Sequence, residues 1–103
     1  MKIKVEGHVY ELENFENKDT FQTLSFIHKV KDPDTFVLST VTDGTTNEEV
    51  IKVLIDRLGY LNGKMQSSYN EEAILHLKLA LEVLEKRTAD RVEKGIEGTA
   101  KTE

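Results

Sequence analysis

The sequence predicts an α+β fold, in which a small N-terminal antiparallel β-sheet precedes an antiparallel two-helix hairpin. Three observations predict it: apolar and polar residues alternate before residue 44, a helical period replaces this alternation afterwards, and two capping motifs stand where helices would begin. The sequence therefore predicts a single domain over residues 1–103, with a β-rich part at 1–44, a helical hairpin at 45–95 and a flexible tail at 96–103.

The β-rich part is expected to contain three or four short strands. The stretches with strand character are Ile3/Val5, Tyr10/Leu12, Leu24/Phe26 and Phe36-Val37-Leu38. Turn residues at 6–7 and 31–34 are typical of hairpin connections between such strands. Gly44 is expected to close the sheet, because glycine tolerates the positive φ that a tight exit often requires.

The first helix is expected to begin at Thr46, whose hydroxyl can cap the first turn while Glu49 reaches back. It is expected to run to about Leu61, and turn residues at 62–67 make the next helix its antiparallel neighbour. One continuous apolar arc follows the helical period; its members are Val50, Ile51, Leu54, Ile55, Leu58 and Leu61.

A second capping box, formed by Ser68 and Glu71, predicts a longer helix that ends before Gly95, a position suited to an αL cap. This helix carries two apolar stripes. The first contains Ala73, Ile74, Leu77, Ala80, Leu81 and Leu84, and the second contains Leu75, Leu79 and Val83. One stripe is sufficient for a core within the chain, so the second predicts packing against another copy, in at least a dimer, through the helices.

Composition excludes several classes of function. With 14 Lys and Arg against 19 Asp and Glu, the net charge of -5 lacks the cationic field of a duplex nucleic-acid binder. The sequence has no cysteine, and its three histidines are scattered, so it offers no thiolate nucleophile and no metal motif. The sequence shows neither a signal peptide nor a membrane span. We therefore expect a soluble intracellular protein without cofactor or metal, and not an enzyme.

Two arginines near the end of the second helix are candidate anion ligands. Arg87 and Arg91 stand at i and i+4, where like charges oppose each other unless an anion or carboxylates lie between them. Guanidinium groups also match phosphate oxygens geometrically. The alternative is ordinary helix-dipole placement of cations, with Asp90 and Glu93 as surface partners.

Tyr60 and Asn70 flank the predicted turn between the helices. Tyr60 lies outside the main apolar arc and can offer its ring to a base, or it can simply cover the rim of the core. Asn70 lies in the first turn of the second helix, where its amide can read a base or ribose edge or complete a cap. Spacing alone leaves both alternatives open.

Several stretches resemble the Thoeris anti-defence protein family of phages. They are GHVYELENF (7–15), DGTTNEE (43–49), LIDRL (54–58), NEEA (70–73), KLALE (78–82), RTADR (87–91) and GIEGT (95–99). The resemblance covers nearly the whole chain, and it is most specific in the helical part.

The resemblance implies a non-enzymatic sponge in the cytoplasm of the bacterial host. Such a sponge captures cyclic ADP-ribose isomers, such as glycocyclic ADP-ribose, made by TIR-domain immune proteins. A related anti-CBASS sponge with a similar helical region implies a hexamer of dimer units and further binding of cyclic di- or trinucleotides. Tyr60, where the family has phenylalanine, would stack the adenine, Asn70 would be the polar reader, and Arg87 and Arg91 would hold the phosphates. The alternative is a non-catalytic oligomerisation or adaptor module that binds a host protein.

Overall fold

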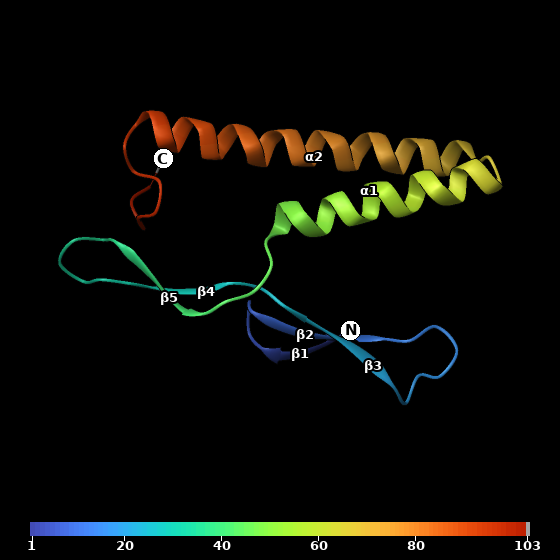
Figure 1. Ribbon diagram of the computed structural model, residues 1–103, viewed down its shortest axis with the longest axis horizontal. Helices are drawn as coiled ribbons and strands as arrows, with labels where there is room; N and C mark the ends of the chain where they lie inside the picture. The colour runs from blue at the N-terminus through green and yellow to red at the C-terminus, as the bar shows by residue number, and fades with distance from the viewer. Residues whose placement is uncertain (103) are drawn as a thin grey trace. The chain divides into compact units, whose positions relative to one another are not determined.

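The computed structural model describes residues 1–102, which form a β-rich unit, Met1–Thr46, and a helical unit that begins at Asn47 (Figure 1). The predicted α+β class is confirmed: antiparallel strands occupy the first unit, and an antiparallel helix pair occupies the second. The change of structure falls within three residues of the predicted change at residue 44.

The β-rich unit holds five strands in two small antiparallel sheets, where the sequence predicted one sheet of three or four strands. The strands are β1 (Lys2–Val5), β2 (Val9–Glu13), β3 (Phe21–Ser25), β4 (His28–Lys31) and β5 (Leu38–Thr42). One sheet has the order β1-β2-β3, and the other pairs β4 with β5.

The break between the sheets lies at Phe26 and Ile27. The amide of Phe26 donates to the carbonyl of His8 (2.7 Å), and the amide of Ile27 donates to that of Thr45 (2.9 Å). The ladder between β2 and β3 therefore ends at Ser25, and His28 begins a new ladder opposite Thr42. The imidazole rings of His8 and His28 stack across this junction, with centroids 3.8 Å apart.

Both predicted hairpin turns are present. Gly7 has φ 76° between β1 and β2, a conformation that glycine adopts without steric cost. Between β4 and β5, the Asp32 carboxylate accepts the amides of Asp34 (2.8 Å) and Thr35 (3.0 Å), and these hydrogen bonds lower the pKa of Asp32. The predicted strand start at Phe36 is wrong: Phe36 has φ 63° and belongs to the turn, so β5 begins at Leu38.

Gly44 is required for a different reason from the one that the sequence suggested. Its φ is not positive, but a Cβ atom there would lie 2.5 Å from the carbonyl carbon of Phe26 and 2.7 Å from the amide nitrogen of Ile27. Both are backbone atoms at the junction of the two sheets. Glycine therefore allows the chain leaving β5 to approach this junction closely.

We expect Gly44→Ala to destabilise the protein by about 1 to 3 kcal/mol, because backbone atoms must shift to admit the methyl group. Urea unfolding followed by circular dichroism measures this change. Gly63→Ala is the matched control, since its Cβ would meet nothing within 4 Å. That variant should gain up to about 1 kcal/mol from helix propensity. An unchanged midpoint for Gly44→Ala would contradict the steric requirement.

The helical unit contains α1 (Asn47–Lys64) and α2 (Ser68–Glu93), which lie side by side and antiparallel (Figure 1). α1 continues three residues beyond the predicted end at Leu61, and the connection is only Met65–Ser67. The predicted capping box at Ser68 is wrong, because Ser67 is the N-cap and its hydroxyl accepts the amides of Tyr69 and Asn70. The Glu71 carboxylate instead accepts the side-chain amides of Asn62 (3.5 Å) and Gln66 (3.3 Å).

Burial within the helix pair follows one face of each helix. The half-buried apolar residues are Val50, Ile51, Ile55 and Leu58 of α1, and Ala73, Ile74, Leu77, Leu81 and Leu84 of α2. The second stripe of α2 is open: Leu75 is 54% exposed, Leu79 48% and Val83 66%. Over residues 1–102 no hydrophobic side chain is fully buried, so this chain alone forms no closed core.

Candidate functional site

Tyr60 lies on the face of α1 that points away from α2. Its side chain is 59% exposed and lines a shallow open groove with Lys52, Val53, Asp56 and Arg57. On the next turn, the Nζ atom of Lys64 lies 5.4 Å from the centre of the Tyr60 ring, within cation–π range. The ring is therefore accessible for stacking.

The groove contains cations that sequence reasoning did not single out. Lys52, Arg57 and Lys64 surround Tyr60 because they stand eight and three residues before it and four residues after it on one helix. A base stacked on the ring would carry its phosphates into this positive surrounding. Helical spacing around Tyr60 was the signal that could have identified them.

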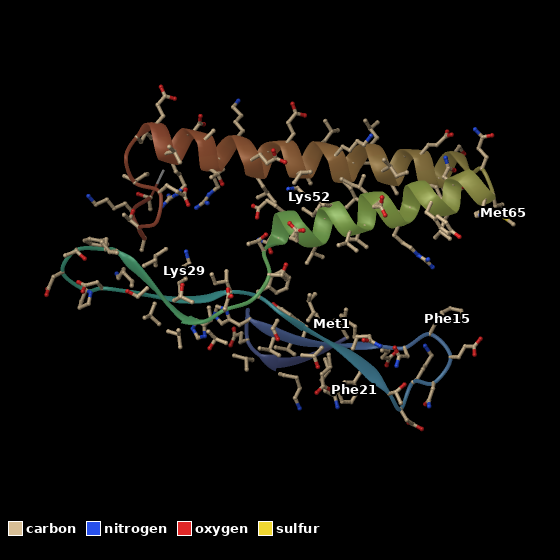
Figure 2. All side chains as sticks on the ribbon, in the orientation of Figure 1. Met1, Phe15, Phe21, Lys29, Lys52 and Met65 are labelled. Atoms are coloured by element: carbon tan, nitrogen blue, oxygen red, sulfur yellow. The ribbon has the colours of Figure 1, made fainter. Side chains whose placement is uncertain are left out.

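Asn70 lies in the first turn of α2, next to the connection that Figure 2 marks at Met65. Its backbone amide donates to the hydroxyl of the N-cap, Ser67, at 3.5 Å. The hydrogen bond that Asn70 contributes to the cap thus comes from its main chain. Its side chain lies on the half-buried face of the helix.

Arg87 and Arg91 occupy the last two turns of α2, and their environments differ. Arg87 is exposed, whereas Arg91 is only 4% exposed. The Arg91 guanidinium donates to the carbonyl oxygens of Ile96 (3.0 Å), Thr99 (2.7 Å) and Lys101 (2.8 Å). Its Nε also donates to the Glu97 carboxylate at 3.3 Å. Segment 96–101, which the sequence predicted to be part of a flexible tail, is hydrogen-bonded to Arg91 in this way.

One chain does not bring the four predicted site residues together. Tyr60 and Asn70 lie at the turn end of the helix pair, and the two arginines lie at the opposite end of α2. At a rise of about 1.5 Å per residue, the 17 positions from Asn70 to Arg87 span about 26 Å. A single nucleotide-sized ligand bound to one chain therefore cannot contact both ends.

His76 and the metal-ligating types of side chain were further candidates for a site. His76 is exposed, with Nε2 3.7 Å from a Glu72 carboxylate oxygen, as expected of a surface residue. Throughout residues 1–102, no three His, Asp or Glu side chains are close enough together to hold a metal ion. None of the helices in this range is both long and apolar enough to cross a membrane.

Comparison with known proteins shows a similarity to a phage protein. The chain is 42% identical, over 69 residues, to Thoeris anti-defense 1 of Bacillus phage SBSphiJ7. The match covers 62% of this chain and 49% of that protein, so the chain spans about half the length of its relative. No family model matches the chain. The similarity to this phage protein confirms the resemblance predicted from the sequence motifs.

Proposed function

We propose that the protein is a phage anti-defence protein that acts against Thoeris immunity in the host cytoplasm. In this proposal it sequesters cyclic ADP-ribose isomers without degrading them. The family similarity supports the anti-defence role, since the relative is named for it. The observation that supports the binding mechanism is the separation of the exposed Tyr60 ring from the arginines, which lie at opposite ends of one helix pair and would have to come from different chains to share one ligand.

The open stripe of α2 supports pairing between copies. Two helices alone cover only one face of each other, so a helix pair with a second apolar stripe gains a core by meeting another pair, as in a four-helix bundle. Leu75, Leu79 and Val83 are centred on Leu79 and are all exposed. A two-fold axis at Leu79 would bury this stripe against its own copy.

Such a pairing would bring the turn end of one helix pair to the level of the arginine end of the other, while Asn70 stays on the half-buried side of α2, opposite the stripe. Consider two antiparallel α2 helices related by a two-fold axis at Leu79. Asn70 lies nine positions before this axis, so along the helix direction it is at the same height as position 88 of the other chain. Arg87 of one copy and Asn70 of the other would then differ by about 1.5 Å along the helix direction. Assembly of such dimers into a hexamer is part of the proposal.

The side chains suit a nucleotide pyrophosphate. A tyrosine ring stacks on a base, guanidinium groups bind phosphate oxygens, and an amide can read a remaining edge. Lys52 and Arg57 in the groove, and Lys64 over the Tyr60 ring, supply further positive charge. These groups bind and orient an anion without attacking it, which supports sequestration over catalysis. A sponge also requires a nanomolar dissociation constant, which corresponds to a binding free energy of about -12 kcal/mol, to keep the concentration of free signal low.

Calorimetry with glycocyclic ADP-ribose tests the proposal. We expect nanomolar binding with one ligand per chain, and we expect heat denaturation of the complex to return the intact cyclic molecule. A changed product would identify an enzyme, and absence of heat would favour an adaptor that binds a host protein. Native mass spectrometry with the same ligand and with cyclic di- and trinucleotides tests both the hexamer and the wider ligand range.

Arg87 is expected to contact phosphate directly. Replacing it with alanine removes charge-assisted hydrogen bonds, each worth about 1.5 to 3 kcal/mol, so affinity should fall roughly 10- to 150-fold. Lys78→Ala is the matched control, because it removes one positive charge from an exposed position of the same helix outside the open stripe. Equal losses in both variants, measured by calorimetry, would mean that Arg87 acts only through net charge.

A further inference from the structure

Arg91 differs from every other polar residue in residues 1–102, because it is the only residue in that range with a buried side chain. Its guanidinium carries five N–H groups, and four hydrogen bonds engage them. Three of the acceptors are main-chain carbonyls of the segment 96–101. The side chain therefore holds a length of backbone and not merely a surface carboxylate.

The main chain of Arg91 contributes to the same arrangement. Gly95 adopts φ 71° directly after the C-cap residue Lys94, and its amide donates to the carbonyl of Val92. The amides of Ile96 and Glu97 then donate to the carbonyl of Arg91 at 3.0 and 3.2 Å. Segment 96–101 is thus joined to Arg91 through both its backbone and its side chain.

This arrangement opposes direct binding of a phosphate by Arg91. A phosphate would have to replace several charge-assisted hydrogen bonds that the protein already provides, and the lost contacts would reduce the net affinity. At most one N–H of the guanidinium remains for another acceptor. Ligand affinity is therefore expected to be higher when Arg91 keeps its present hydrogen bonds than when it exchanges them for contacts to a phosphate.

The held segment lies at the same end of α2 as Arg87. Arg91 follows Arg87 by one helical turn, about 6 Å along the axis. The carbonyl of Lys101 accepts from Nη1 of Arg91 at 2.8 Å, which keeps the backbone of another cationic residue at this end. An anion bound at Arg87 would lie about one helical turn from the residue that holds this segment.

We infer that Arg91 is a positioning residue that holds segment 96–101 at the C-terminal end of α2, and that this held segment forms part of the anion site. The inference rests on the proposed function for its second half. Arg91 acts through the segment, whereas Arg87 touches the ligand.

Hydrogen exchange on the ligand-free protein tests the first half. In Arg91→Ala, amide exchange of a peptide covering 96–101 should be at least tenfold faster than in the unchanged protein. Arg87→Ala, one turn away, should leave that exchange unchanged. Equal exchange in Arg91→Ala and the unchanged protein would show that the side chain does not hold the segment, and it would overturn the inference whatever the ligand is.

A double-mutant cycle with glycocyclic ADP-ribose tests the second half. Gly98 has φ 81°, which proline cannot adopt, so Gly98→Pro disrupts the segment while keeping Arg91. We expect Arg91→Ala and Gly98→Pro each to weaken binding at least tenfold, and the double variant to bind no more weakly than either single one. Native mass spectrometry verifies that all variants keep the same assembly.

Two outcomes would overturn this second half. Unchanged affinity in Gly98→Pro combined with loss in Arg91→Ala would make Arg91 a direct ligand. Additive losses in the double variant would mean that the two residues act separately. If the unchanged chain gives no heat with the probe, the proposed function fails and the binding half of the inference fails with it, while the exchange result still decides whether Arg91 holds the segment.

Discussion

Tyr60→Ala is expected to weaken binding of glycocyclic ADP-ribose by roughly 5- to 150-fold, because stacking of a base on an aromatic ring is worth about 1 to 3 kcal/mol. Tyr60 is 59% exposed and contributes nothing to a buried core of its own chain. The variant should therefore keep the helical content and melting temperature of the unchanged protein. Calorimetry and circular dichroism on the same samples separate the two effects.

Tyr60→Phe is the matched control for this prediction. It keeps the ring and removes only the hydroxyl, so affinity within about threefold of the unchanged protein would identify the ring face as the binding element. A loss in Tyr60→Phe equal to that in Tyr60→Ala would assign the contact to the hydroxyl instead. Unchanged binding in Tyr60→Ala would reject stacking at this position.

Leu79→Glu is expected to dissociate the assembly into single chains. Leu79 stands at the centre of the exposed stripe of α2, and a two-fold axis there would bring both copies of the new carboxylate together. Each chain would lose the burial of a leucine, about 1.5 to 3 kcal/mol, and would gain an unpaired charge in the interface. Analytical ultracentrifugation measures the resulting mass.

The same variant tests the shared site. If each site draws residues from two chains, Leu79→Glu should abolish tight ligand binding although Tyr60, Asn70 and Arg87 are all retained. Lys78→Glu is the control for the new carboxylate: it places a glutamate at the adjacent exposed position outside the stripe, and it should preserve both mass and affinity although it lowers the net charge by two units instead of one. A monomeric Leu79→Glu chain that still binds tightly would reject a site between chains.

The ring of Tyr60 lies close to several positively charged side chains. Lys64 already lies over the ring, and Arg57 lies one turn earlier on the same face. A base that stacks there brings its phosphates near these cations, even though the chain as a whole is negative. Local grouping of charge on one helix face can thus create an anion site in an acidic protein.

The sequence by itself determined the class of fold, the change from strands to helices and the positions of several turns. The alternation before residue 44, the turn residues around Gly7 and Pro33, and the αL glycine at Gly95 act over a few neighbouring residues, so their effects can be read locally. It also determined the second stripe of α2, because helical periodicity alone shows that more than one face is apolar. The resemblance to the anti-defence family also rested on short sequence motifs.

Only the tertiary structure decided the features that depend on contacts between distant residues. The division into two sheets follows from the amides of Phe26 and Ile27, whose partners His8 and Thr45 lie about 18 residues away along the chain in either direction. The N-cap is Ser67 and not the predicted Ser68, because both neighbouring serines have a hydroxyl that can cap the helix and only the backbone geometry selects one of them. Arg87 and Arg91 look equivalent in the sequence, yet folding of segment 96–101 buries one and leaves the other exposed. That difference arises because a guanidinium is buried only where enough acceptors converge on it, and helical spacing does not encode which carbonyls will do so.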